Sequence, residues 1–323
     1  MRVAVDVTPL LGPLSGVGQT VRGLLDALPD EVDVARWELT RRSVPIPPRV
    51  LVRLWSRLDH PRADRWLPDA DVVHGTNFVV PPTSRPATVT VHDSWCARRG
   101  ECDPTIAAAT ATVRRAVDRG AWLHVSTEWM AGEVRSLYGA ERVRVVPFGV
   151  PAVPEAGPSP VAGPYVLALN PSDHRKGHDV LVEAMHEVPG VELVLANARG
   201  WVDDATRAAL LRGATVLAYP SRDEGFGFPV LEAMSVGVPV VASAVGGVPE
   251  ALGRGDDGSH PGLLVRPDDP TALAAALRRW LEDPHRRRRL GRSAGLRRLT
   301  LPTWSQTSAR VAAALESSLE AVR

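Results

Sequence analysis

The amino-acid sequence predicts an α/β protein with two domains, each built on a parallel β-sheet covered by helices. Three observations support this prediction. The chain has 323 residues, which is more than one hydrophobic core usually accommodates. Short apolar runs alternate with helical stretches, and such alternation produces parallel sheets. Residues 151–160 are rich in Pro and Gly, and this linker-like stretch divides the apolar runs into two sets.

Ten short apolar runs are predicted to be the strands, because each is rich in β-formers and bounded by turn residues. The domains that they define are residues 1–155 and 163–303, and residues 304–323 are predicted to form a final helix. The predicted strands are residues 2–7, 71–74, 87–92, 121–125, 143–146, 164–169, 191–196, 214–219, 238–242 and 262–265.

The composition, 44% hydrophobic and 23% charged residues, is typical of a globular protein. The net charge of +1 favours no polyanionic partner, so we expect no nucleic acid. No apolar run approaches the length of a membrane helix. The basic helical stretch 285–298 is most simply a solvated face, and the alternative is peripheral contact with anionic membrane lipid.

Cys96 and Cys102 are the only cysteines. A predicted strand begins almost at once, with no signal peptide before it, so the sequence favours reduced thiols in a cytoplasmic protein. His92 could join the two cysteines as a metal ligand, but their spacing is not that of a known zinc site. We therefore expect no metal there.

The run 224–232, Glu-Gly-Phe-Gly-Phe-Pro-Val-Leu-Glu, places a glycine-rich loop between a predicted strand and a predicted helix. Gly225 and Gly227 let a ligand approach the backbone, and the N–H groups of a helix start favour an anion such as phosphate. Glu224 and Glu232 would repel a phosphate, so we predict that they accept hydrogen bonds from hydroxyl groups of a sugar or ribose. The alternative is a glycine turn with two solvated acids.

Lys176 is the only lysine, and the other 37 of the 38 basic residues are arginine. It follows the predicted strand 164–169, at the strand end where ligands of open α/β sheets bind. A site shaped for a compact charge on a phosphate would not accept a planar guanidinium in its place. We predict that Lys176 is the charge partner of the run 224–232; the alternative is chance survival of one lysine.

Two strand ends of the first domain also carry candidate residues. Residues 11–18 form a glycine-containing loop before a predicted helix, and this loop could meet a diphosphate, although the spacing is not that of the dinucleotide fingerprint. The strand 87–92 delivers His92, which can donate a hydrogen bond, and Asp93, which can orient it or cap the next segment. A structural histidine is the alternative.

The following strand ends before Ser126 and Thr127. These two residues predict either a helix start or a contact on the acceptor side of a site.

Together these motifs resemble those of the retaining glycosyltransferases of family 4, which have the GT-B fold of two Rossmann-like domains facing a cleft. The resemblance spans nearly the whole chain, is most specific over 214–250, and implies that the helix after Trp304 packs back onto the first domain. The matching segments are 15–18, 91–93, 125–126, 146–150, 175–177, 221–234, 237–240 and 246–250.

The resemblance implies a nucleotide-diphosphate-sugar donor in the second domain and a hydroxyl acceptor in the first. Glu224 would bind the transferred sugar, Glu232 the ribose and Lys176 the diphosphate. The other implied contacts to the donor are Gly16, His92, Gly225, Phe226 and Gly227.

The same resemblance implies same-face attack, with the departing phosphate taking the proton of the acceptor. Fixed cations and backbone donors lower the barrier to such a reaction. We expect no metal or other cofactor, and we interpret the acidic pairs 203–204, 256–257 and 268–269 as surface or loop residues.

The sequence departs from the family pattern at two places. Where members carry Gly-Arg after a strand, this chain has Asn170, and Arg175 is the candidate substitute. Residues 197–213 leave room for only one crossover helix, so the segment that commonly contacts the nucleobase is shortened. The alternatives to a transferase are therefore a catalytically impaired donor-binding or scaffold protein, and a nucleotide-sugar epimerase of the same fold.

Overall fold

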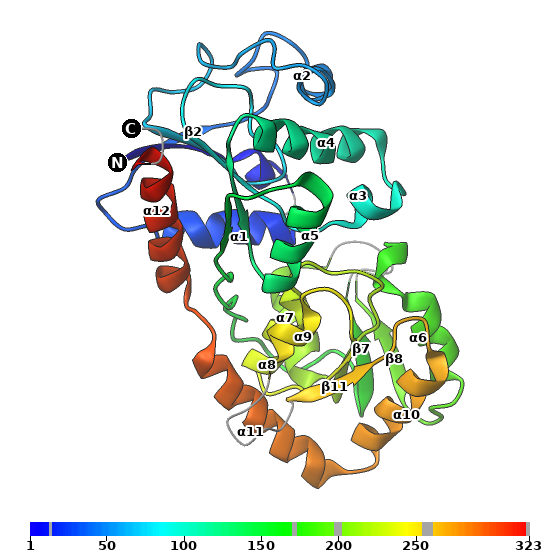
Figure 1. The fold of residues 1–323 in the computed structure, drawn as a ribbon. Coiled ribbons are helices and arrows are strands. Elements are labelled where there is room, and N and C mark those ends of the chain that lie inside the picture. Colours follow the sequence, from blue (N-terminus) through cyan, green and yellow to red (C-terminus); the bar gives the residue numbers. More distant parts are fainter. Residues whose placement is uncertain (13–14, 170–172, 197–201, 254–260, 321–323) are drawn as a thin grey trace. The chain divides into compact units, whose positions relative to one another are not determined.

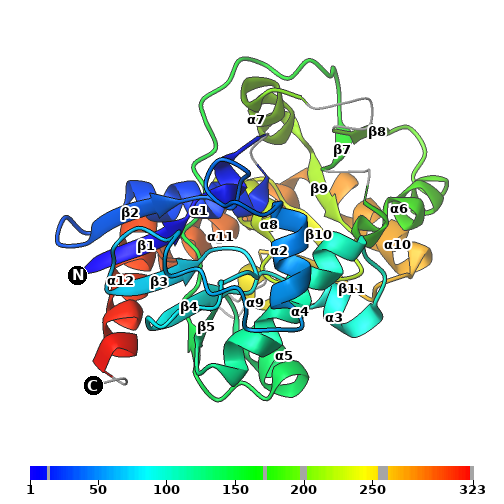
Figure 2. The same ribbon diagram turned by 90° about the horizontal axis from the view of Figure 1, so that it is seen from above.

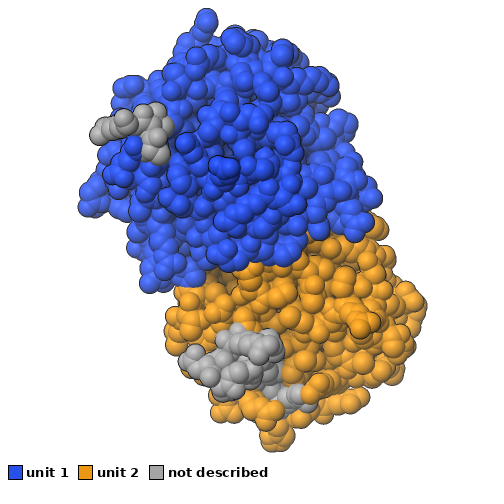
Figure 3. Space-filling model, viewed as in Figure 1, with its two compact units in different colours: residues 1–149, 302–323 blue, residues 150–301 orange. Residues whose placement is uncertain are grey.

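The structure is a computed structural model, and it describes residues 1–323 except 13–14, 170–172, 197–201, 254–260 and 321–323. The chain divides into two compact units, which Figure 3 shows in different colours. Unit 1 is Met1–Gly149 with Pro302–Arg323, and unit 2 is Val150–Leu301. Each unit has its own parallel sheet, which confirms the predicted α/β class.

The sheet of unit 1 has the strand order β2-β1-β3-β4-β5-β6, and all of its strand pairs are parallel. The order reverses at β1, so the carboxyl ends of β1 and β3 form a topological switch point, where ligands of such sheets bind. The strands are β1 (Arg2–Asp6), β2 (Asp33–Trp37), β3 (Val72–Gly75), β4 (Ala87–Thr90), β5 (Trp122–Val125) and β6 (Val143–Val145).

Helices cover both faces of this sheet (Figure 1). Val3 and Val5 pack with α1 and α12 on one face, whereas Ala4 belongs to the core under α2, α4 and α5 on the other. The short helix α3 packs against α4. The helices of unit 1 are η1 (Thr8–Leu10), α1 (Gly16–Asp26), α2 (Pro48–Trp55), α3 (Trp95–Arg99), α4 (Pro104–Asp118), α5 (Glu128–Tyr138) and α12 (Trp304–Glu320).

The C-terminal helix α12 is held on unit 1 by close packing around Trp304. A Cβ atom on Gly23 would lie 2.4 Å from the Trp304 indole, and one on Gly149 would lie 2.6 Å from the Trp304 backbone nitrogen. Only glycine therefore leaves room for the helix at these two places. The Thr307 hydroxyl also donates a hydrogen bond of 2.8 Å to the Pro147 carbonyl.

The sheet of unit 2 has the order β11-β10-β9-β7-β8, again with parallel pairs (Figures 1 and 2). Its order reverses at β7, which has β8 on one side and β9 on the other. The strands are β7 (Tyr165–Ala168), β8 (Glu192–Leu195), β9 (Val216–Tyr219), β10 (Val240–Ser243) and β11 (Gly262–Val265).

The helices of unit 2 pack on both faces of its sheet. Val166 contributes to the core with α6 and α10, and Leu167 to the core with α7, α8 and α9. The helices are η2 (His174–Lys176), α6 (His178–Met185), α7 (Asp204–Gly213), α8 (Phe228–Ser235), α9 (Val248–Leu252), α10 (Pro270–Leu281) and α11 (Pro284–Thr300).

All ten predicted strands are present, and one strand was missed. The missed strand, β2, lies at the edge of its sheet and carries Asp33 and Arg36, which interrupt the apolar pattern. Of the acidic pairs, 256–257 lies outside the described residues. Asp203 and Asp269 cap the starts of α7 and α10, which are loop positions as expected.

The basic stretch 285–298 lies in α11. Two of its arginines bind the backbone of unit 2 itself. Arg287 donates to the carbonyls of Trp280 and Leu281, and Arg297 to that of Glu250. The contact with anionic lipid stays a prediction. Among the described residues, no helix has the length and apolarity needed to cross a membrane.

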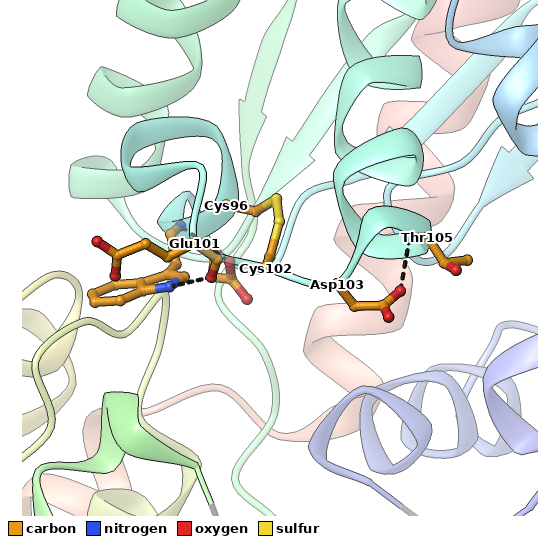
Figure 4. Close-up of a disulfide and its surroundings, with 7 residues drawn as sticks. Cys96, Glu101, Cys102, Asp103 and Thr105 are labelled. Atoms are coloured by element: carbon orange, nitrogen blue, oxygen red, sulfur yellow. Dashed lines mark hydrogen bonds between the residues drawn. A yellow bond between two sulfur atoms is a disulfide. The ribbon is translucent and has the colours of Figure 1, made fainter.

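The prediction of two reduced thiols is wrong, because Cys96 and Cys102 form a disulfide (Figure 4). Helix α3 is followed by Gly100, whose left-handed backbone turns the chain back so that the Cα atoms of Cys96 and Cys102 lie 5.6 Å apart. The Trp95 indole N–H donates to the Glu101 carbonyl within the same loop. The sequence argument considered the cellular compartment and not this local geometry.

Candidate functional site

In unit 2, the predicted site residues follow the two strands that flank the switch point. Helix η2, which ends with Lys176, follows β7, and the loop 220–227 follows β9. The Arg222 backbone N–H donates to the Arg175 carbonyl over 2.7 Å, so the two segments are joined directly. The Arg222 guanidinium binds Asp179 and the His174 carbonyl, which fixes the loop further.

Lys176 and Glu224 meet at this point. The Lys176 ammonium donates to Glu224 Oε1, and the Ser221 hydroxyl donates to the same oxygen over 2.9 Å. The side chains of Lys176 and Glu224 are only 18% and 12% exposed, so water screens their charges little. The ammonium also lies 5.8 Å from the centre of the Tyr219 ring. Burial, and then the Glu224 charge, hold the pKa of Tyr219 well above its usual value.

The backbone of the loop is held by close approaches that require glycine. Gly246 has φ +55°, and a Cβ atom there would lie 1.8 Å from the Glu224 carbonyl oxygen. The neighbouring Gly247 N–H donates to that same oxygen over 2.9 Å. Gly177, with φ +63°, leaves similar room for the Pro220 carbonyl. Both contacts fix the position of the Glu224 segment.

Gly246→Ala is expected to destabilise unit 2 more than Gly190→Ala does. Both residues have positive φ, but a Cβ atom on Gly190 would meet nothing within 4 Å. Backbone strain is therefore common to the two variants, and the clash with Glu224 should cost about 1–3 kcal/mol more. Urea denaturation of both variants measures the difference. Equal midpoints would show that the loop does not need this close approach.

The second predicted carboxylate, Glu232, has a partner that the sequence did not identify. Glu232 lies in α8 with its side chain 3% exposed, and the Arg207 guanidinium binds both of its oxygens, with Nη1 3.1 Å from Oε1. Arg207 comes from α7, whose start is capped by Asp203. Nothing in the sequence distinguishes Arg207 from the other arginines, because the contact depends on where the fold places α7 and α8.

Arg175, the candidate substitute for a missing arginine, binds Asp173. Its Nε and Nη2 atoms lie 3.0 and 2.8 Å from Asp173 Oδ2. Burial acts to raise the pKa of Asp173, but hydrogen bonds from Arg175 outweigh it and lower that pKa. Asn170 lies outside the described residues, as does part of the shortened segment, 197–201.

The glycine-rich part of the run lies immediately before α8. Gly227 has φ +92° and forms the N-cap, and Pro229 occupies the first turn. Phe226 and Phe228 pack edge to face with ring centres 5.1 Å apart. The helix start that was predicted for an anion is therefore present. Gly225, Phe226 and Gly227 lie between Glu224 and this helix start.

In unit 1, His92 follows β4. Its Nε2 lies 2.8 Å from the Thr76 carbonyl, which only accepts hydrogen bonds, so Nε2 carries the proton and Nδ1 of the neutral ring is an acceptor. Burial lowers the pKa of His92, against the opposing effects of Thr76 and Asp93. The hydrogen-bond donor that we predicted for His92 is thus used within unit 1. Its Nδ1 remains as a hydrogen-bond acceptor.

The other candidates in unit 1 lie at helix starts. Gly16 begins α1, and the Ser15 hydroxyl caps that helix by accepting from the Gly18 N–H. Residues 13–14 of the preceding loop lie outside the described residues. Asp93 accepts from the Trp95 N–H, which corresponds to the capping alternative. Thr127 caps α5, which corresponds to the helix-start alternative.

Unit 1 also contains a buried chain of polar groups that the sequence did not predict. His124 Nε2 donates to the Val146 carbonyl over 3.0 Å, so its Nδ1 accepts from the Thr90 hydroxyl, which in turn accepts from His74 Nε2 over 2.9 Å. Nδ1 of His74 is buried and has no hydrogen-bond partner in the described part of the chain. Each histidine is therefore held in its neutral form.

The buried histidines are expected to make the protein less stable in mild acid. Burial is the main cause that lowers the pKa of His74 to about 3 and that of His124 to about 4, from an ordinary 6.5. Below pH 6.5 the unfolded chain therefore takes up protons that the folded chain does not, and stability falls as the pH drops toward 4. Asp6 opposes this trend, because burial raises its pKa to about 6.

Thermal unfolding between pH 7.5 and 5 measures this effect. We expect the wild type to lose on the order of 2 kcal/mol and the His74→Gln variant to show a shallower slope. Identical slopes for the two proteins would contradict the assignment of the pH dependence to the histidine chain.

Comparison with known proteins identifies a family and several proteins that the chain resembles. Residues 197–297 match the model of the family described as glycosyl transferases group 1. O-antigen chain mannosyltransferase B of Escherichia coli is 28% identical over 273 residues, which cover 70% of each chain. MMP alpha-(1->4)-mannosyltransferase of Mycolicibacterium hassiacum is 35% identical over 133 residues, which cover 41% of this chain and only 31% of that protein.

Solved structures share the fold over essentially the whole chain. Sucrose-phosphate synthase of Thermosynechococcus elongatus superposes with a TM-score of 0.74 at 20% identity and full coverage of both chains. The Anabaena protein HepE, solved in complex with UDP-glucose, gives a TM-score of 0.72 at 16% identity, covering 98% of this chain and 100% of that one. The chain therefore has the GT-B fold, and residues 197–297 of its second unit resemble the group 1 glycosyltransferases.

Proposed function

We propose that the chain is a retaining transferase of family 4, which moves a hexose-type sugar from a nucleotide-diphosphate-sugar donor to a hydroxyl group of a glycan, lipid or small molecule. The observation that carries this proposal is the contact between Lys176 and Glu224 at the switch point of the unit 2 sheet. The named relatives support it, since both are mannosyltransferases and one fold neighbour was solved with UDP-glucose.

Each proposed residue binds the part of the donor that matches its chemistry. Glu224 accepts hydrogen bonds from hydroxyls of the transferred sugar, and Glu232 accepts them from the ribose. Lys176 and the N–H groups at the start of α8 face the diphosphate. On unit 1, we propose that His92 Nδ1 accepts a hydrogen bond from a sugar hydroxyl.

In the proposed reaction, the bond between the anomeric carbon and the diphosphate oxygen breaks while the acceptor oxygen bonds to the same face of that carbon. The acceptor proton passes to the departing phosphate oxygen. Negative charge grows on the leaving group, and Lys176 stabilises it in a poorly hydrated site. We propose that no metal ion takes part, because the protein itself supplies this positive charge.

A thermal-shift screen with UDP-, GDP-, ADP- and TDP-sugars tests the proposal. A ligand that binds only the folded chain, at one hundred times its Kd, stabilises it by about 2.7 kcal/mol. We expect one nucleotide class to raise the melting temperature of the wild type, and the Lys176→Met variant to lose that shift. No shift with any donor would contradict the proposal and favour a scaffold protein.

A further inference from the structure

Both carboxylates of the proposed donor site are held by cations of unit 2. Glu224 is bound by Lys176, and both oxygens of Glu232 are bound by Arg207. The four charges cancel within the protein. Each carboxylate therefore has a cation where the proposed function requires a hydroxyl group of the donor.

The ribose cannot reach Glu232 in this arrangement. The Glu232 side chain is 3% exposed, and the guanidinium of Arg207, whose side chain is 20% exposed, binds both of its oxygens. Ribose hydroxyls would have to replace the guanidinium before they could bind the carboxylate. A displaced guanidinium needs another anion, because an unpaired charge in a poorly hydrated site is costly.

The donor brings such an anion. Its diphosphate carries about two negative charges, and Lys176 supplies one positive charge. Other arginines near Lys176 are engaged elsewhere: Arg175 binds Asp173, and Arg222 binds Asp179 and Asp268. Among the described residues, the Arg207 guanidinium forms hydrogen bonds only to Glu232.

We infer that Arg207 is a further donor-binding residue, which moves from Glu232 to the diphosphate when the donor binds. This inference rests on the proposed function. The α-phosphate is attached to the ribose, so a guanidinium displaced by the ribose hydroxyls is released beside that phosphate. Lys176 makes the parallel exchange, from Glu224 to the diphosphate, as the sugar hydroxyls bind Glu224. Internal ion pairs are thus replaced by hydroxyl–carboxylate and phosphate–cation contacts.

The exchange predicts a specific effect on selectivity. A nucleoside must break the Arg207–Glu232 pair and offers the guanidinium nothing in return, whereas a nucleoside diphosphate offers its phosphates. In Arg207→Met, neither ligand has a pair to break, and the diphosphate loses one bidentate charge-assisted partner. The ratio of the nucleoside Kd to the nucleoside diphosphate Kd therefore isolates the contact between Arg207 and phosphate.

The test measures this ratio by competition against a labelled nucleotide, with UDP and uridine, GDP and guanosine, and ADP and adenosine. For the nucleoside and nucleoside diphosphate that the wild type binds, Arg207→Met should lower the ratio of their Kd values at least about tenfold. The affinity for the nucleoside should not fall. Arg207→Lys should restore part of the ratio. Arg212→Met is the matched control, because Arg212 lies on the same helix but binds the carbonyls of Val153 and Pro154.

A purely structural role for Arg207 would weaken both ligands equally and leave the ratio unchanged, which would overturn the inference but not the proposed function. Should Arg207→Met fail to fold, the double variant Arg207→Met/Glu232→Gln is compared with the single variant Glu232→Gln. This comparison measures the same ratio of Kd values and leaves no unpaired buried carboxylate. Absence of nucleoside diphosphate binding in the wild type would overturn the inference and the proposed function together.

Discussion

Lys176→Met is expected to lower kcat/KM for donor turnover about 10²–10³-fold. One preorganised donor to a developing oxyanion is worth roughly 3 kcal/mol, and Lys176 is poorly hydrated, so its charge acts strongly. Loss of the ammonium also leaves Glu224 without its cation. Steady-state release of the nucleoside diphosphate measures the effect.

Lys176→Arg is the informative companion of this variant. It keeps the charge but places a planar fork where a compact ammonium lies between Glu224 and the Tyr219 ring. We expect turnover or donor binding to fall about tenfold or more despite the retained charge. Normal transfer by Lys176→Arg would show that the site needs only a positive charge. The presence of a single lysine in the chain would then have no functional cause.

Glu224→Gln is expected to lower kcat about 10²-fold while nucleoside diphosphate binding stays the same or becomes tighter. The amide is a poorer acceptor for the sugar hydroxyls, so contacts to the transferred sugar weaken. The nucleotide part does not touch Glu224, and Lys176 no longer has to leave a carboxylate to bind phosphate.

Calorimetric titration with the nucleoside diphosphate, beside turnover with the full donor, separates the two effects. Ser221→Ala is a useful control, because it removes one hydrogen bond to Glu224 but keeps the charge. Unchanged kcat in Glu224→Gln would remove Glu224 from the site. A parallel loss of nucleotide binding would instead assign Glu224 to the nucleotide.

The sequence predicts most of the fold because buried parallel strands are short, apolar and rich in β-branched residues. The run Val216–Tyr219 shows this pattern. The edge strand β2 does not show this pattern, because Asp33 and Arg36 occupy positions that need not be apolar. The structural position of Gly227 can also be predicted from the sequence, because a helix start with Pro229 follows it directly.

Contacts between distant segments are the part that the sequence could not supply. Lys176 and Glu224 could be associated because each follows a strand of the same sheet, at neighbouring ends. Arg207 could not be associated with Glu232, because the positions of α7 and α8 in the folded unit decide which arginine meets that carboxylate. The disulfide likewise depends on the left-handed turn at Gly100.

The histidine chain needed the register of the strands. Thr90 and His124 are direct partners in the β4–β5 ladder, and His74 reaches Thr90 from β3. Residues that are 16 and 34 positions apart in sequence become neighbours only once that register is known.

The measurement that tests the account most directly is the anomeric configuration of the product, followed by NMR together with release of the nucleoside diphosphate. The reaction would use the donor selected by the thermal-shift screen, with water as the acceptor where no other acceptor is supplied. We expect release that depends on Lys176 and Glu224, and a product sugar that keeps the configuration of the donor. Inversion of that configuration, or release that Lys176→Met leaves unchanged, would contradict the account.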